Sequence, residues 1–363
     1  MADLSVFSRN YADARARFQD SCRLRGGRVH SIAHKGTTGA EGEALFLDVG
    51  IFGDPAAARV LVIGSGTHGV EGYAGSAAQS AWILGGGPAA LPTGVAVVCT
   101  HAHNPWGFAH GHRETEENVD LNRNFTAHFG NYPDNPGYKA LHPRITPAQW
   151  DEPHIGAIFE ALEAFRSQHG EQAFSDAYNG GQYSHADGIF FGGHREQWSH
   201  AALREAIGTH VGHARMAAMI DIHTGIGPFL GHIFLGFHAR ESPAFARARA
   251  WWGERAVNRE GVTHKAVAHY QGLLVDAFCD WLPAAQTTAT VVEFGTRPRP
   301  AMQRATLAGR WLRYHGGAHP EEAARVRTDH LDAFYPADPR WRAAVLIQSR
   351  EIIDRAVAGL ATS

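Results

Sequence analysis

The chain has 363 residues, of which 44% are hydrophobic and 19% charged, with a formal net charge of −3. This balance is typical of a globular chain with a sizeable core, and it excludes disordered, collagen-like and small disulfide-stapled proteins. The charge shows no basic excess over the whole chain, which argues against nucleic acid as a partner. The unusual count is 24 histidines. Histidine is the commonest metal ligand, so the count suggests a metal site without locating it.

The cysteines and the N-terminus bear on the compartment. Cys22, Cys99 and Cys279 are odd in number and far apart, so they predict neither a disulfide framework nor a cysteine zinc site. Residues 1–20 lack the apolar stretch of a signal peptide. No run approaches the roughly 20 apolar residues that span a bilayer. We therefore expect a cytoplasmic protein that has no membrane contact.

Helices and short apolar strands are predicted to alternate along the chain. We expect helices over 7–25, 73–84, 155–169, 201–207 and 244–257. Strands are expected over 44–51, 59–63, 95–100, 216–223, 232–237 and 288–294. Several of these strands are continuously apolar, which is typical of strands buried on both faces. The alternation predicts an α/β fold, a three-layer α/β/α sandwich with a mixed, mostly buried central sheet.

Two segments depart from this alternation. Residues 127–198 are rich in Gly, Pro, Asn and Tyr and are too long for a simple connection, so we interpret them as a loop-rich insertion. The C-terminal tail from about 319 has a helical pattern interrupted by Pro336 and Pro339. We find no internal repeat, and we place residues 1–363 in a single catalytic domain.

The first candidate site follows the strand at 59–63. A Gly-rich turn leads to His68 and Glu71, at the edge of an α/β sheet where ligands usually bind. Residues spaced i, i+3 project to the same side of a helical turn, so both side chains can reach one zinc ion. The alternative is a plain glycine turn or a phosphate loop, although no Walker lysine follows it.

A second candidate lies in the loop over 104–125. Asn122 and Arg123 offer an amide and a planar guanidinium that suit a carboxylate, and Arg113 precedes them. Asp and Asn residues crowded in this way are also typical of a loop rich in Asx turns.

Two further candidates stand at the ends of apolar strands. His223 follows Asp221 on one strand face, so the carboxylate can orient the imidazole. Glu293 ends another apolar strand, where burying a carboxylate requires a partner. A general base beside a Lewis-acidic metal fits this position. The alternatives are a core histidine and a structural ion pair.

The order of these motifs carries a family resemblance. It runs His68-Gly-Val-Glu71, Asn104-Pro-Trp-Gly, Asp120-Leu-Asn-Arg-Asn-Phe, His223 and Glu293. In this order the chain resembles the M14 zinc carboxypeptidase clan, which includes the succinylglutamate desuccinylase and aspartoacylase branch. The Asp-Ile-His-Thr-Gly and Glu-Phe-Gly-Thr motifs and the segment 181–193 resemble the bacterial DUF2817 family of M14-like metallopeptidases. The resemblance covers about residues 40–300 and implies a zinc carboxypeptidase-like fold.

The resemblance implies a role for each matching residue. His68, Glu71 and His223 match the zinc triad, with one zinc ion per chain. Glu293 matches the general base and Arg113 the arginine that polarises the scissile carbonyl.

The remaining matches concern the substrate. Asn122 and Arg123 match the pair that binds a substrate carboxylate. Tyr270 matches a mobile-loop tyrosine by its position 23 residues before Glu293.

Two departures from the clan pattern concern the spacing of the matching residues. Arg113 precedes Asn122 by only nine residues, and 152 positions separate Glu71 from His223. The long separation places an insertion between the ligands, which would narrow the range of substrates.

Two readings from other classes remain to be weighed. His101 and His103 lie two apart on one strand, as in amidohydrolase barrels, although eight strand–helix repeats are not visible. A non-enzymatic reading treats the histidines as a metal-storage or pH-sensing surface.

We favour a zinc metallohydrolase that cleaves an amide bond next to a free carboxylate, as a carboxypeptidase does. The alternative within this class is an N-acyl amino acid amidohydrolase. The partner is then a small peptide or an N-acyl amino acid, and a homo-oligomer is left open.

Overall fold

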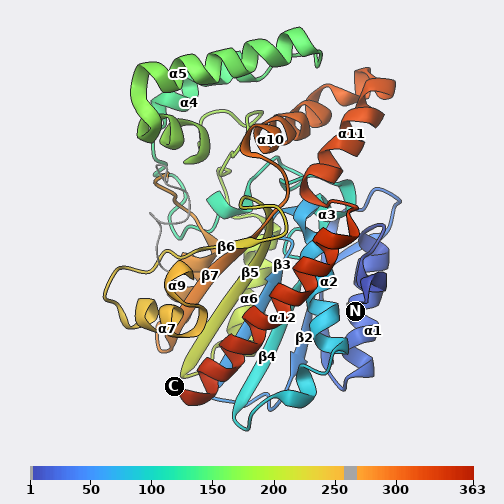
Figure 1. The fold of residues 1–363 in the computed structure, drawn as a ribbon, viewed down its shortest axis with the longest axis vertical. Coiled ribbons are helices and arrows are strands. Elements are labelled where there is room, and N and C mark those ends of the chain that lie inside the picture. Colours follow the sequence, from blue (N-terminus) through green and yellow to red (C-terminus); the bar gives the residue numbers. More distant parts are fainter. Residues whose placement is uncertain (1–2, 257–267) are drawn as a thin grey trace.

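A computed structural model describes residues 3–256 and 268–363, and its centre is a seven-stranded mixed sheet in the order β1-β2-β4-β3-β5-β7-β6 (Figure 1). The strands are β1 (Arg28–Thr38), β2 (Ala44–Phe52), β3 (Arg59–Ser65), β4 (Val95–His101), β5 (Met216–Gly225), β6 (His232–Leu235) and β7 (Gln286–Gly295). The central strands β4, β3, β5 and β7 are parallel, whereas the outer pairs β1/β2, β2/β4 and β7/β6 are antiparallel.

Helices cover both faces of the sheet. On one face pack α1 (Tyr11–Leu24), α2 (Gly72–Leu84), α7 (Pro243–Trp252) and α12 (Pro339–Thr362). On the other lie α6 (Trp198–Val211) and α9 (Leu274–Trp281). Apolar strand residues fill a separate core on each side, because β3 and β4 are buried along nearly their whole length. The predicted α/β sandwich with a buried, mixed sheet is confirmed.

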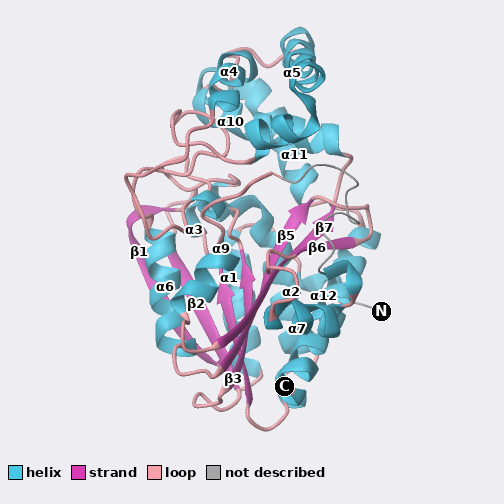
Figure 2. Cartoon of the chain, turned by 90° about the vertical axis from the view of Figure 1, so that its left-hand side faces the viewer, coloured by secondary structure: helices cyan, strands magenta, loops and turns pink. Residues whose placement is uncertain are grey.

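A further group of helices lies beyond the carboxyl ends of the parallel strands (Figures 1 and 2). It comprises α4 (Pro136–Ile145), α5 (Glu152–Asn179), α10 (Arg299–Tyr314) and α11 (Pro320–Phe334). These helices share their own hydrophobic cluster, which includes Tyr138, Trp150 and Trp311. The carboxyl ends of the parallel strands therefore face this group of helices.

Short helices connect the larger elements. They are α3 (Pro105–His110) and the 3₁₀ helices η1 (Leu4–Val6), η2 (Gly69–Glu71), η3 (Pro88–Ala90), η4 (Leu121–Arg123), η5 (Glu254–Ala256) and η6 (Gly316–Ala318). Asn104 caps α3, because its side chain accepts a hydrogen bond from the Gly107 amide, and Pro105 occupies the first helical position.

Some predicted elements were wrong in extent or kind. The segment 127–198 is not mainly loop, since it holds α4 and the 28-residue α5, in which Gly170 interrupts the helical backbone at φ 84°. The strand β1 was not predicted, because most of its residues are polar and exposed or half-buried, so its sequence contains no apolar run. The first helix begins at Tyr11, where Asn10 caps it, and not at residue 7. Residue 257, the predicted end of the helix from 244, lies outside the described residues.

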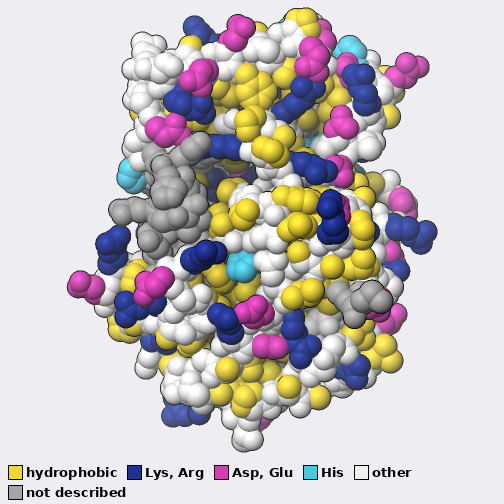
Figure 3. Space-filling view, viewed as in Figure 1, with side chains coloured by type: hydrophobic (Ala, Val, Ile, Leu, Met, Phe, Trp, Pro, Cys, Tyr) yellow, Lys and Arg dark blue, Asp and Glu magenta, His cyan; other side chains and the backbone are white. Residues whose placement is uncertain are grey.

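Two further observations concern the described helices and one face of the surface. No helix in residues 3–256 and 268–363 has the length and apolar character needed to cross a membrane. On the face seen in Figure 3, basic and acidic side chains are interspersed, without a continuous basic patch.

Candidate metal centre and active site

Three side chains meet at the carboxyl ends of β3 and β5. His68 follows β3, Glu71 ends η2, and His223 lies in β5. The Glu71 carboxylate contacts both imidazoles, with Oε1 2.9 Å from His68 Nδ1 and Oε2 2.9 Å from His223 Nδ1. The two Nδ1 atoms are 3.1 Å apart. The predicted ligands are therefore brought together by the two strands.

The three side chains fit a zinc ion. One ligand atom of each lies within 4.8 Å of the others, and tetrahedral zinc with bonds of about 2.0–2.1 Å places its ligand atoms about 3.3 Å apart. The residues are nearly inaccessible, at 4%, 2% and 1% exposed for His68, Glu71 and His223. Two imidazoles and one carboxylate form a donor set typical of catalytic zinc sites.

The outward nitrogens of both imidazoles face carboxylates. His223 Nε2 is 2.6 Å from Asp221 Oδ2, and His68 Nε2 is 3.2 Å from Asp120 Oδ1. These contacts leave both Nδ1 atoms facing Glu71. The role of Asp221 was predicted from its place on β5. Asp120 was noted only within its motif, because nothing local in the sequence indicates a contact 52 residues away.

Glu293 lies beside this cluster on the neighbouring strand. In the parallel pairing of β5 and β7 it is the register partner of His223, and it is only 7% exposed. Its Oε2 is 3.4 Å from the backbone nitrogen of Ile226, which donates to it. Burial, together with the negative charge of Glu71, raises the pKa of Glu293 to about 7. This carboxyl group can therefore bind or release a proton near neutral pH.

Arg113 is held against the ligands themselves. Its Nη1 donates to Glu71 Oε1 at 3.1 Å, and its Nη2 donates to Asp120 Oδ2 at 3.1 Å. Nη2 also lies 2.7 Å from His68 Nε2. The structure thus places Arg113 at the site, with a guanidinium that two carboxylates already neutralise.

Arg123 is buried without a carboxylate partner. The residue is 5% exposed, and its guanidinium donates to two backbone carbonyls, those of Asn122 at 2.8 Å and Asn179 at 2.6 Å. Its Nε has no hydrogen-bond partner, and in the described parts of the chain no Asp or Glu forms an ion pair with it, although its charge helps to lower the pKa of Asp120. The side-chain oxygen of Asn122 accepts from the Leu274 amide at 3.0 Å, which fixes this loop to α9.

Aromatic rings surround the Arg123 guanidinium. Its Cζ lies 4.8 Å from the ring centre of Tyr270 and 5.6 Å from that of Phe190. Burial raises the pKa of Tyr270, whose hydroxyl is therefore neutral at physiological pH. The structure accordingly places Tyr270 next to Arg123, while Phe190 was not foreseen.

The histidine pair His101 and His103 does not form a metal site. His101 Nε2 bonds with Ser76 Oγ at 2.9 Å and its ring stacks on Phe18, whereas His103 bonds with Thr67 and Thr100. Both imidazoles are fully buried. They belong to different hydrogen-bond networks, and the sheet is open, so the amidohydrolase-barrel reading is wrong.

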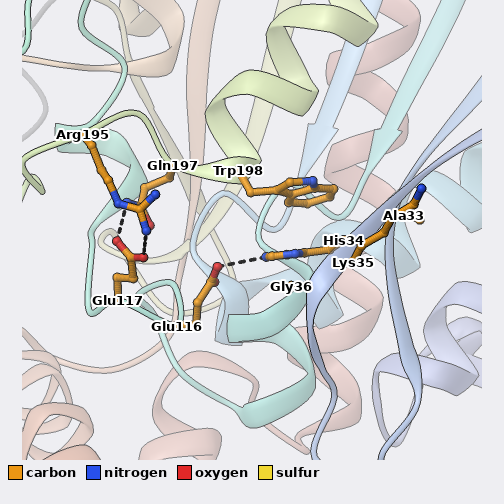
Figure 4. A pocket seen from close by; sticks show the side chains of 9 residues that line it. All are labelled: Ala33, His34, Lys35, Gly36, Glu116, Glu117, Arg195, Gln197 and Trp198. Carbon is orange, nitrogen blue, oxygen red and sulfur yellow. Dashed lines mark hydrogen bonds and ion pairs between the residues drawn. The ribbon is translucent and has the colours of Figure 1, made fainter.

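A separate cavity of about 540 Å³ lies at the β1 edge of the sheet (Figure 4). In it, His34 stacks on Trp198 at 4.1 Å and bonds with Glu116 at 2.9 Å. Its lining is Ala33, His34, Lys35, Gly36, Glu116, Glu117, Arg195, Gln197 and Trp198. None of the three candidate ligands belongs to this lining, so we place the chemistry elsewhere.

Comparison with known families extends this picture. The profile of the family described as "Protein of unknown function (DUF2817)" matches residues 7–348. The chain belongs to this family. The predicted DUF2817 resemblance is thus confirmed, and no curated protein matches the chain.

Several solved structures resemble this DUF2817 protein at low identity. Carboxypeptidase A from Helicoverpa armigera is 15% identical with a TM-score of 0.45, over 90% of this chain and 74% of that one. A metallo-carboxypeptidase from Burkholderia cenocepacia is 15% identical with a TM-score of 0.42, over 85% and 69%. The murein-tripeptide amidase from Escherichia coli O157 is 15% identical with a TM-score of 0.35, over 85% and 93%.

Proposed function

We propose that this DUF2817 protein is a zinc-dependent hydrolase that cleaves an amide bond next to a free carboxylate. The observation that carries the proposal is the buried His68–Glu71–His223 cluster, beside which Glu293 lies in register with His223. When bound there, zinc would supply the Lewis acidity that makes water nucleophilic at neutral pH.

Glu293 is suited to move the proton in this reaction. A pKa of about 7 lets the carboxylate accept a proton from the attacking water and return it to the leaving nitrogen. Because no hydrogen bond joins Glu293 to His68, Glu71 or His223, its loss would remove the base and leave the three ligands in place.

Arg123 is suited to hold the substrate carboxylate. A buried guanidinium without an acidic partner is costly, and a carboxylate from a substrate would satisfy its free Nε. We assign Asn122 the role of orienting this arginine, whose Nη1 bonds to the Asn122 carbonyl. Tyr270 packs over the guanidinium and would close on the bound substrate.

We assign Arg113 to the carbonyl of the scissile bond. The guanidinium of Arg113 contacts Glu71, and the Arg113 side chain is 14% exposed. A donor in this position would stabilise negative charge that develops on the carbonyl oxygen.

Two substrate classes meet these requirements. One is a peptide with a free C-terminus, cleaved as a carboxypeptidase would. The other is an N-acyl amino acid. The carboxylate clamp formed by Arg123 is enclosed, because Arg123 is 5% exposed beneath Phe190 and Tyr270, and an enclosed clamp favours this second class. A compact substrate fits such a clamp better than a long chain does.

The test is a substrate screen of the zinc-loaded protein. Short peptides with free and amidated C-termini are compared with N-acyl amino acids and their amides. We expect hydrolysis only where a free carboxylate is present, loss of activity on chelation, and recovery with zinc. Activity that survives complete chelation, or that ignores the carboxylate, would overturn the proposal.

A further inference from the structure

A buried chain of hydrogen bonds leads away from His223 across three neighbouring strands. Beyond the contact between His223 and Asp221, Thr67 Oγ1 lies 2.9 Å from both carboxylate oxygens of Asp221. The same hydroxyl oxygen is 2.8 Å from His103 Nδ1. At the far end, His103 Nε2 is 2.7 Å from Thr100 Oγ1. The chain thus connects β5 to β4.

A glycine in β3 makes room for this chain. Gly64 is the register partner of Thr100 on one side and of Asp221 on the other. A Cβ atom at Gly64 would lie 2.7 Å from His103 Cε1 and 3.1 Å from Asp221 Oδ1. The imidazole of His103 therefore crosses the sheet over the one position of β3 that has no side chain.

The members of this chain must satisfy one another. Thr67, Thr100, His103 and Asp221 are all 0% exposed, and His223 is 1% exposed. Buried polar groups need hydrogen-bond partners, and in a chain of this kind each bond constrains the direction of the next.

The donors and acceptors give the chain one direction. A carboxylate only accepts, and a threonine hydroxyl has one hydrogen to donate. Thr67 must donate that hydrogen to Asp221, since its Oγ1 otherwise faces two carboxylate oxygens at 2.9 Å without a proton between them. The Thr67 oxygen then accepts from His103 Nδ1–H, and His103 Nε2 accepts from Thr100.

The same carboxylate sets the tautomer of His223. Asp221 accepts from His223 Nε2–H, which leaves Nδ1, the nitrogen that faces Glu71, as the nitrogen able to bind zinc. We infer that Thr67 and His103 are positioning residues that hold Asp221 and so keep His223 in the tautomer able to bind zinc. The inference rests on the zinc site of the proposed function.

The test compares two substitutions of one residue. Thr67→Val keeps the shape and removes the hydroxyl, whereas Thr67→Ser keeps the hydroxyl. Thr290→Val is the matched control, because Thr290 is also 0% exposed but bonds only to backbone carbonyls. Zinc affinity is measured by competition with a chelator, and the His223 Nε2–H signal is followed by ¹H–¹⁵N NMR of the zinc-loaded protein.

We expect Thr67→Val to weaken zinc binding about 10–100-fold, the range for losing an outer partner of a ligand, while Thr67→Ser and Thr290→Val stay near wild type. In the NMR spectra of zinc-loaded Thr67→Val, the His223 Nε2–H signal should shift or broaden, because Asp221 is held less firmly. His103→Phe should weaken zinc binding in the same direction, and combining it with Thr67→Val should add little, because both break one chain.

Two results separate this inference from the proposed function. If wild type binds zinc and Thr67→Val binds it equally well with an unchanged His223 Nε2–H signal, the inference is wrong and the zinc site stands. If wild type binds no zinc, the proposed function is overturned, and with it the role of these residues in zinc affinity.

Discussion

Gly69 lies in the turn that carries His68 and Glu71, where this turn packs against Asn104-Pro-Trp-Gly107. Replacing Gly69 with alanine tests that packing. A Cβ atom at Gly69 would lie 2.0 Å from the carbonyl carbon of Gly107 and 2.2 Å from the nitrogen of Phe108. Ordinary contact begins at 3.4 Å, so the two backbones would have to separate by about 1.4 Å. Neither atom belongs to a flexible side chain that could swing aside.

The separation of the two backbones would displace the proposed zinc ligands His68 and Glu71. The Gly69 amide donates to the Arg113 carbonyl at 3.1 Å, and Gly69 lies between the ligands His68 and Glu71. Overpacking of a tight site costs about 1–3 kcal/mol, and active-site groups tolerate displacements of only about 0.5 Å. We therefore expect Gly69→Ala to lower the free energy of unfolding by about 3 kcal/mol and to lose most of its bound zinc.

The assays are chemical denaturation and metal analysis of purified protein. Gly208→Ala is the matched control, since Gly208 lies in α6 with nothing within 4 Å of its Cβ position. Alanine there should stabilise the protein by about 0.5–1 kcal/mol, because glycine is the poorer helix former. A Gly69→Ala protein with wild-type zinc content and an unchanged unfolding curve would refute the packing argument.

Three other predictions follow from the site and the core. Glu293→Gln should keep its zinc and lose about 10²–10⁴-fold in turnover, and loss of stoichiometric zinc would contradict its assignment as the base. Arg123→Ala should impair substrates that carry a free carboxylate, and equal impairment of an amidated substrate would count against the clamp. Burial lowers the pKa of His101 to about 4, so the unfolded state binds more protons between pH 6.5 and 4 and stability falls as the pH falls through that window. The loss should reach about 3 kcal/mol for this residue, and denaturation curves of His101→Gln should show a smaller dependence on pH.

The strands that position the site could be predicted because their sequences are continuously apolar. The runs in β3, β4, β5 and β7 are buried on both faces, so their pattern identifies them without knowledge of their partners. The edge strand β1 has polar residues on its open face, and α4 lies in a segment whose glycines and prolines suggested loop. In both cases tertiary packing decides a structure that local composition leaves open.

The three candidate ligands could be predicted from motif order, whereas the residues that contact them could not. His68, Glu71 and His223 stand at strand ends in a characteristic sequence, and the structure brings them together. Thr67 and His103 act on His223 from 156 and 120 positions away, and only the strand order makes them neighbours. The histidine count suggested metal binding, but other buried imidazoles, such as those of His101 and His330, lie outside the candidate metal site.

Phe190 combines a strained backbone with contacts to two arginines. Its φ of 53° lies in the left-handed region, where a bulky residue is strained by about 1–3 kcal/mol. Its ring stands over the cations of both Arg113 and Arg123, at 5.3 Å and 5.6 Å. Glycine adopts this backbone conformation without strain, so Phe190→Gly would relieve the strain and remove both ring–cation contacts. The fold thus holds this ring beside two arginines at the expense of backbone stability.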